Sequence, residues 1–252
     1  MNTDSDGVIE KPAVWGLPGT IIWGIIIICV LIISQVVAIG VYTVVNHPDA
    51  GTVDTELLMN RYLYHGQAIA YGLITSLAVC LPLVLGIVKL KKNTSLGSYL
   101  GFRPVPLRIL GYWVLIYLGF SIVYDLVGYF LGSRIVPEFS LAIYETGRGS
   151  LLFWFAVLVA APFLEEVIFR GFLFRGIEAS ILGPVGAVLL TSLVWTAIHM
   201  QYSLFWQANI FVLGILFGLA RYKTGSTLVT FQLHFLHNLL AMAITAGVAE
   251  AW

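Results

Sequence analysis

Seven long apolar segments, separated by short polar loops, run along this chain of 252 residues. They cover residues 20–45, 66–88, 109–132, 151–170, 184–201, 205–220 and 226–248. Each is close to the ~20 residues that an α-helix needs to cross a bilayer. Because backbone hydrogen bonds must be satisfied inside the bilayer, apolar runs without strand-like alternation favour helices. The pattern predicts an all-α, polytopic membrane protein with about seven (seven or eight) transmembrane helices.

The composition agrees with a membrane protein. Apolar residues make up 59% of the chain and charged residues only 10%, whereas soluble domains carry about 25% charged residues. The 13 basic residues are balanced by 13 acidic ones, so no excess of positive charge favours nucleic acid as a partner. Cys29 and Cys80 both lie inside apolar runs, which argues against a disulfide or a cysteine metal site. The expected partners are the lipid bilayer and a membrane-associated protein or peptide.

The distribution of lysine and arginine predicts the orientation in the membrane. If the strongly basic loop 89–108 is cytoplasmic, ten of the thirteen basic residues lie on the cytoplasmic side and three lie outside. The outer three are Arg61, Arg134 and Arg148. We therefore expect an integral, multi-pass protein of the bacterial plasma membrane with a cytoplasmic N-terminus, an outer C-terminus and a site reached from the cytoplasmic half.

Charged residues interrupt the fourth apolar segment, where "EEVIFRG" occupies residues 165–171. Ionisable groups inside a membrane span are costly and usually face a cavity or a partner. Glu166 and Arg170 are four residues apart, with the acid on the N-terminal side, which is the better order for a helical ion pair. Glu165 is rotated by about 100° from Glu166 on a helix. The spacing therefore predicts one neutralised glutamate and one available glutamate.

Two later segments carry histidines. "WTAIHM" places Trp195 one helical turn before His199, and "HFLHN" places His234 and Asn238 on one helix face. At 1.5 Å per residue, Glu165, His234 and His199 lie about 15, 12 and 22 Å from the cytoplasmic ends of their spans. The first two depths agree, and the third requires the fifth span to tilt or to start later. Three helices can thus bring a carboxylate and two imidazoles together.

Taken one at a time, each of these residues is more often structural than catalytic. A lone intramembrane histidine usually bonds a neighbouring helix, and an asparagine such as Asn238 often does the same. His237 has no motif role and is interpreted as structural. Asp125, alone in the third span, can simply bond a neighbouring helix. The convergence of Glu165, His199 and His234 is what favours catalysis.

That set suits hydrolysis. A buried carboxylate can take a proton from water, and an imidazole beside it can orient the same water. A second imidazole and a carboxamide can donate hydrogen bonds to a developing oxyanion. The same Glu165, His199 and His234 can instead hold a zinc ion as a metalloprotease would, although the common H-E-x-x-H helix is absent. The cofactor is therefore left open between Zn²⁺ and none.

The three motifs resemble the signatures of the CPBP intramembrane proteases. This family includes CAAX prenyl endopeptidases and bacteriocin-processing and self-immunity proteins, and is also called Abi. Its pattern is EExxxR, then FxxxH, then HxxxN or HxxxD. "EEVIFR" and "HFLHN" fill the first and third motifs, and in the second Trp195 stands where phenylalanine is usual. The similarity covers about residues 150–245.

The resemblance implies a role for each matched residue. Glu165 would be the general base, with His199 as its partner on the water. His234 and Asn238 would form the oxyanion site, and Glu166 and Arg170 would support the architecture. It also implies a division into an N-terminal tail with three spans, residues 1–149, and a protease core of four spans, residues 150–248.

The sequence therefore predicts an intramembrane endopeptidase that hydrolyses a peptide bond of a membrane-associated protein or peptide, with prenylated or CAAX-like chains among the candidate substrates. Two alternatives stay open. A proton-coupled transporter would use the same glutamate and histidines as a relay, but transporters usually contain repeated halves, which this sequence does not show. A non-catalytic self-immunity or scaffold protein would have no need to retain all four of Glu165, His199, His234 and Asn238.

Overall fold

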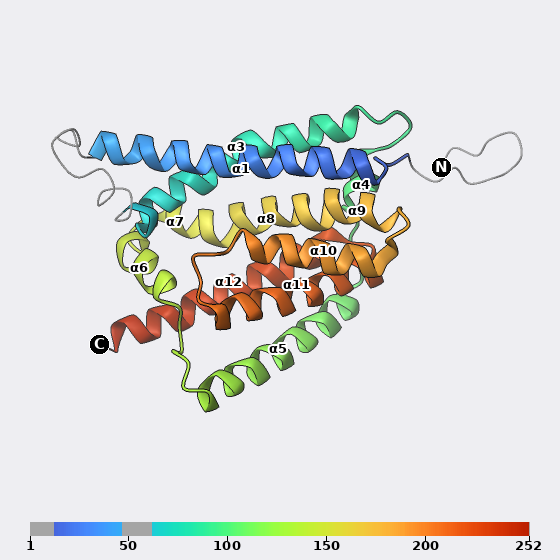
Figure 1. The fold of residues 1–252 in the computed structure, drawn as a ribbon. Helices are drawn as coiled ribbons and strands as arrows, with labels where there is room; N and C mark the ends of the chain where they lie inside the picture. The colour runs from blue at the N-terminus through green and yellow to red at the C-terminus, as the bar shows by residue number, and fades with distance from the viewer. Residues whose placement is uncertain (1–12, 47–61, 252) are drawn as a thin grey trace, which may run out of the picture.

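The computed structural model describes residues 13–46 and 62–251, which fold into a bundle of antiparallel helices without a β-strand in that part of the chain (Figure 1). Six helices in it are long and apolar enough to cross a membrane, and a seventh apolar helix is shorter. The bundle is therefore all-α with about seven apolar helices, as the pattern predicts. The separate helices are α1 (Leu17–Asn46), α3 (Gly66–Lys89), α5 (Leu107–Phe130), α10 (Gly183–Ala197), α11 (Leu204–Thr224) and α12 (Thr227–Glu250).

The fourth long helix is a continuous run, Leu151–Glu178, in which α-helical and π-helical stretches alternate. Its parts are α7 (Leu151–Phe155), η2 (Ala156–Ala160), α8 (Ala161–Glu166), η3 (Val167–Leu173) and α9 (Phe174–Glu178). The π-helical stretches lie on both sides of the Glu165–Glu166 pair. Such stretches are rare and occur frequently at functional sites.

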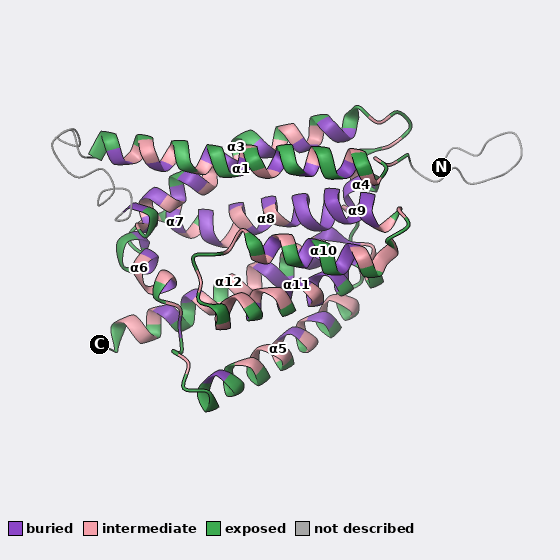
Figure 2. Ribbon diagram, in the orientation of Figure 1, coloured by how far each residue is buried: buried purple, intermediate pink, exposed green. Residues whose placement is uncertain are grey.

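This run occupies the centre of the bundle (Figure 1). Helices α1 and α3 pack beside each other on one side of it, and α10, α11 and α12 lie on the other side. Figure 2 shows its second half as almost entirely buried, whereas α1 and α5 present many exposed positions. Two short helices, α4 (Leu96–Leu100) and α6 (Glu138–Gly147), connect the long ones. Exposed apolar faces on the outer helices suit contact with lipid.

Helices α10 and α11 pack closely because small residues line their contact. A Cβ atom added to Gly214 would lie 2.8 Å from the Cβ of Ser192, and one added to Gly218 would lie 3.2 Å from Val188. Both glycines belong to the "GILFG" motif, and small residues at this spacing let two helix backbones approach closely. This approach brings the Gly214 carbonyl within reach of the central helix.

Two segment ends differ from those expected from the apolar pattern. The fourth helix continues to Glu178 instead of ending at residue 170, and its last turns bury the apolar side chains of Phe174 and Ile177. Helix α10 ends at Ala197, so His199 lies in the following turn and not on the span 184–201. Fifteen residues rise only about 22 Å, less than the ~30 Å bilayer core. This short helix explains how His199 reaches the level of Glu165.

Candidate active site

A buried cluster surrounds Glu166 on the central helix. Its Oε1 atom accepts hydrogen bonds from Arg170 Nη1 at 2.9 Å and from His234 Nδ1 at 3.0 Å. Both members of the Glu166–Arg170 pair are fully buried, and Arg170 Nη2 also donates to the Gly214 carbonyl at 3.3 Å. The ion pair expected from the spacing of four residues is therefore present. It ties the central helix to α11 and α12.

The neighbouring Glu165 has different surroundings. It is half-buried, and its Oε2 atom accepts a hydrogen bond of 2.6 Å from the indole Nε1 of Trp195. The nearest cation on its own helix, Arg170, is engaged by Glu166. The two adjacent glutamates thus differ as their helical spacing predicts. Glu165 keeps a carboxylate that is held by one neutral donor.

Trp195 links Glu165 to His199. Its indole donates to Glu165, and its backbone carbonyl lies 2.7 Å from His199 Nδ1. A carbonyl oxygen can only accept a hydrogen bond, so the proton of this bond sits on Nδ1. In the neutral imidazole, Nε2 then carries a lone pair that can accept a hydrogen bond from water. The geometry therefore fixes the tautomer in which His199 can orient a water molecule.

The two polar residues of the third motif both contact other helices. His234 bonds to Glu166, as described above. Asn238 donates a hydrogen bond from Nδ2 to the backbone carbonyl of Val157 at 2.9 Å. Val157 belongs to the π-helical stretch η2. An amide nitrogen has two N–H groups, so one donor of Asn238 remains after this bond. His237, three residues from His234, pairs instead with the hydroxyl of Tyr117 at 3.2 Å.

These residues border a cavity of about 320 Å³ between α5, α12 and the α10–α11 connection, here called the inner cavity. Four polar site residues line it, namely Trp195, His199, His234 and Asn238. Glu165 is not among its lining residues and connects to it through the hydrogen bond to Trp195. Asp125, His237 and Tyr117 also line it, which places Asp125 in a cavity instead of against a neighbouring helix. Glu166 and Arg170 lie behind this wall.

The inner cavity lies in the half of the bundle that is away from the N-terminus. Its walls include Val136, Pro137 and Tyr202 from the connections at the end where α5 finishes and α11 begins. In Figure 1 these connections lie at the end of the bundle that also holds the C-terminus. The expected orientation and the expected access from the cytoplasmic half stay predictions.

The predicted zinc alternative finds no ligand cluster in this part of the chain. Within residues 13–46 and 62–251, no group of three or more His, Cys, Asp or Glu side chains lies close enough to hold a metal ion. His234 uses Nδ1 on Glu166, and Glu165 Oε2 is occupied by Trp195. These bonds leave Nε2 of His234 and Oε1 of Glu165 available, so the choice between Zn²⁺ and no metal stays a prediction.

The double role of Trp195 is the feature that sequence reasoning missed. The sequence marked this position only as an aromatic residue in place of phenylalanine. The available signal was chemical, because a buried tryptophan usually needs an acceptor for its one N–H group. Trp195 is 2% exposed. The preceding motif, EEVIFR, contains glutamates whose carboxylates can accept a hydrogen bond from its indole. Tyr117, the partner of His237, was also not singled out.

The fold and this site define a multi-pass membrane protein with a buried polar centre. Residues 147–240 match the family model described as "Type II CAAX prenyl endopeptidase Rce1-like". The resemblance to the CPBP proteases is thus confirmed over these residues, and it supports an intramembrane peptidase. No curated protein and no solved structure matches the chain. The division of the chain at residues 149 and 150 stays a prediction.

Proposed function

We propose that this protein is an intramembrane endopeptidase that hydrolyses a peptide bond of a membrane-associated protein or peptide. The observation that carries the proposal is the connection from Glu165 through Trp195 to His199. It joins a carboxylate to an imidazole with a fixed tautomer at the wall of a cavity. A carboxylate and an imidazole acting on the same water are the components of general base catalysis.

In the proposed reaction, Glu165 takes a proton from the attacking water. His199 accepts the second hydrogen bond of that water at Nε2, because its Nδ1–H is committed to the Trp195 carbonyl. The water oxygen then attacks the scissile carbonyl carbon. Glu165 afterwards returns the proton to the leaving amine. The free active site need not show these contacts fully formed, since catalytic hydrogen bonds often tighten only when substrate binds.

The tetrahedral intermediate needs donors for its negative oxygen. Asn238 has one N–H left after its bond to Val157. His234 donates from Nδ1 to Glu166, so it can also donate from Nε2 only as the doubly protonated imidazolium. We assign His234 and Asn238 to the oxyanion site, and Glu166 and Arg170 to the support of His234 and the helix contacts.

The proposed substrate class is a membrane-associated, prenylated or CAAX-like chain. The family description names CAAX prenyl endopeptidases, and the inner cavity combines the polar site residues with apolar walls such as Leu118, Ile122 and Ile210. A small number of polar groups in an apolar cavity is the usual form of a site for a largely apolar ligand. No step of the proposed reaction is routed through a metal.

Proteomics of membrane fractions tests this proposal. Cells that produce the wild-type protein are compared with cells that produce Glu165→Gln at equal abundance, and new peptide N-termini in membrane proteins are quantified. We expect a set of N-termini that is present with the wild type and lost with the variant. An identical set in both samples would contradict peptide-bond hydrolysis by Glu165.

A further inference from the structure

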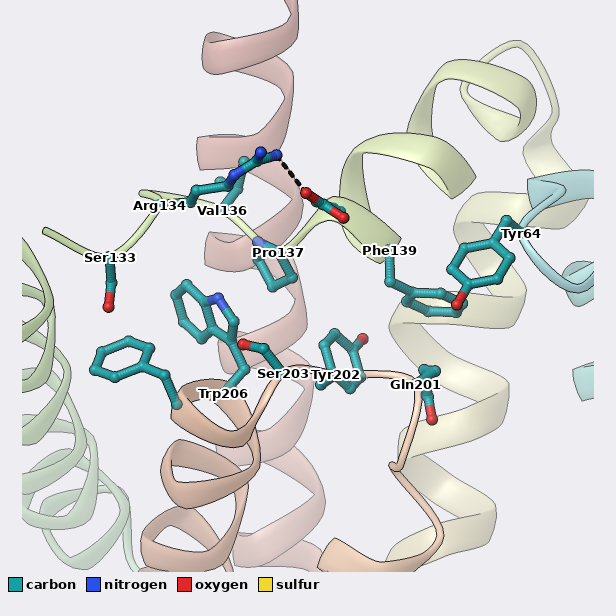
Figure 3. Close-up of a pocket in the computed structure, with 12 residues that line it drawn as sticks. Tyr64, Ser133, Arg134, Val136, Pro137, Phe139, Gln201, Tyr202, Ser203 and Trp206 are labelled. Atoms are coloured by element: carbon teal, nitrogen blue, oxygen red, sulfur yellow. Dashed lines mark ion pairs between the residues drawn. The ribbon is translucent and has the colours of Figure 1, made fainter.

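A second cavity, of about 370 Å³, adjoins the inner cavity and is here called the outer cavity. Figure 3 shows it between the segment that begins at Ser133 and the segment that begins at Gln201. Four residues line both cavities, namely Val136, Pro137, Tyr202 and Trp206. The outer cavity is therefore continuous with the wall of the proposed active site.

A series of aromatic rings leads from the outer cavity to His199. Tyr64 contacts Phe139 with ring centroids 5.7 Å apart, and Phe139 contacts Tyr202 at 5.2 Å. The ring of Tyr202 stacks on His199 with centroids 6.2 Å apart. Aromatic rings supply large, shaped apolar contact surfaces. A group bound against Phe139 and Tyr202 would thus lie next to the imidazole that we assign to the water.

The rim of the outer cavity is polar and lies beyond the helix ends. Arg134 and Glu138 form an ion pair of 2.7 Å there, with side chains 70% and 73% exposed. Ser133, Gln201 and Ser203 also line the cavity. Charges of both signs and hydroxyl or amide groups suit a polypeptide backbone better than a lipid chain. A substrate segment that extends from the inner cavity past Val136 and Pro137 would enter this end of the bundle.

We propose that the outer cavity binds a bulky apolar side chain of the substrate polypeptide, on the side of the scissile bond that leaves the membrane. This inference rests on the proposed function. An extended chain advances about 3.3 Å per residue, and the Tyr202 ring lies 6.2 Å from His199. The Phe139 ring lies a further 5.2 Å from Tyr202, so the bound side chain lies roughly two to four residues from the scissile bond. The outer cavity would act as a specificity site for the protease.

The test fills the outer cavity without touching the inner one. Gln201→Trp is suitable because Gln201 is exposed and lines only the outer cavity. Ser203→Trp is a second variant, since Ser203 precedes α11 without a side-chain capping bond. Ile181→Trp is the matched control, because Ile181 is 98% exposed and lines neither cavity. Each full-length protein is purified in detergent, and its melting temperature is compared with that of the wild type.

The probe is a proteome-derived peptide library, with cleaved peptides identified by mass spectrometry. For the wild type and Ile181→Trp we expect bulky apolar residues to be enriched two to four positions from the cleaved bond on one side. Gln201→Trp and Ser203→Trp should cleave these peptides about tenfold more slowly, which corresponds to the lost burial of one apolar side chain. Peptides that end before those positions should be cleaved at the wild-type rate.

Two results would overturn the inference. One is a wild-type cleavage pattern without any such enrichment. The other is an equal loss for short and long peptides in both tryptophan variants with unchanged melting temperatures, which would indicate a general effect on the active site. The absence of any Glu165-dependent cleavage by the wild type would instead count against the proposed function.

Discussion

Glu165 and Glu166 are adjacent in the sequence but belong to two different regions of the molecule. Glu166 is fully buried, and one of its oxygens binds both Arg170 and His234. Glu165 is half-buried and is held by a single donor, the indole of Trp195, which lines the inner cavity. The comparison teaches that one turn of helix can supply both a fully buried, ion-paired carboxylate and a half-buried one held by a single neutral donor, because the two side chains leave the helix about 100° apart.

The largest loss of turnover among these variants is expected from His199→Ala, at a residue that lines the inner cavity. Removing the imidazole deprives the water of its proposed acceptor, and one general acid–base group contributes about 10²–10⁴-fold to a rate. Turnover of an identified substrate should fall by this factor with little change in melting temperature. Met200→Ala is the control, since Met200 is 77% exposed and should retain full activity. A variant of His199 with wild-type turnover would remove this residue from the mechanism.

On the buried side, Glu166→Gln should mainly destabilise the fold. Removing the charge leaves Arg170 buried without its partner, and loss of one member of a buried pair costs about 3–5 kcal/mol. Thermal melts in detergent measure the effect. Glu178→Gln serves as the control because its pair with Arg175 is partly exposed and should contribute less than about 1 kcal/mol. If Glu165→Gln unfolds the protein and Glu166→Gln does not, the two roles are reversed.

A smaller loss of turnover is expected from Trp195→Phe. This substitution tests the connection from Glu165 through Trp195 to His199. The substitution keeps an aromatic ring and the carbonyl that binds His199, but it removes the donor to Glu165. A hydrogen bond to a charged group is worth about 1.5–3 kcal/mol, so we expect a loss of about tenfold or more in turnover. Trp154→Phe removes a comparable indole bond, to the Arg148 carbonyl, far from the site. Equal rates for both variants would show that the Trp195 bond has no part in catalysis.

The smallest effect is expected from removal of metal ions. Since Glu165, His199 and His234 do not form a three-ligand group in the described residues, exhaustive chelation should leave turnover within about twofold, far below the loss from a missing general base. The measurement compares treated and untreated protein, with melting temperature as a check on the fold. If chelation abolishes turnover, and zinc restores it whereas magnesium does not, the result would support the zinc alternative.

Much of this architecture could be predicted from the sequence, because long apolar runs without strand-like alternation predict membrane helices. The Glu166–Arg170 pair also followed from its spacing of four residues. The end of α10 did not follow, since Ile198 and Met200 continue the apolar pattern although the helix stops at Ala197. The position of the inner cavity did not follow either, because it depends on how α5 packs against α12.

In the site, too, features set by neighbouring residues could be predicted, whereas contacts between residues far apart in the sequence could not. Helical spacing is local, so it separated the roles of Glu165 and Glu166. The bond from Trp195 to Glu165 joins residues 30 positions apart, and that of Asn238 to Val157 joins residues 81 positions apart. Such bonds depend on the rotation of each helix in the bundle, which no local pattern fixes. The proposed roles of these residues stay predictions.

The central claim is that Glu165 performs the chemistry while Glu166 holds the fold. Its most direct test is cleavage of the peptide library by purified wild-type protein and Glu165→Gln under identical conditions. The account predicts equal melting temperatures and a loss of cleavage of at least about 10²-fold in the variant, as expected for removal of the general base. Cleavage by Glu165→Gln at the wild-type rate, with an intact fold, would contradict the account.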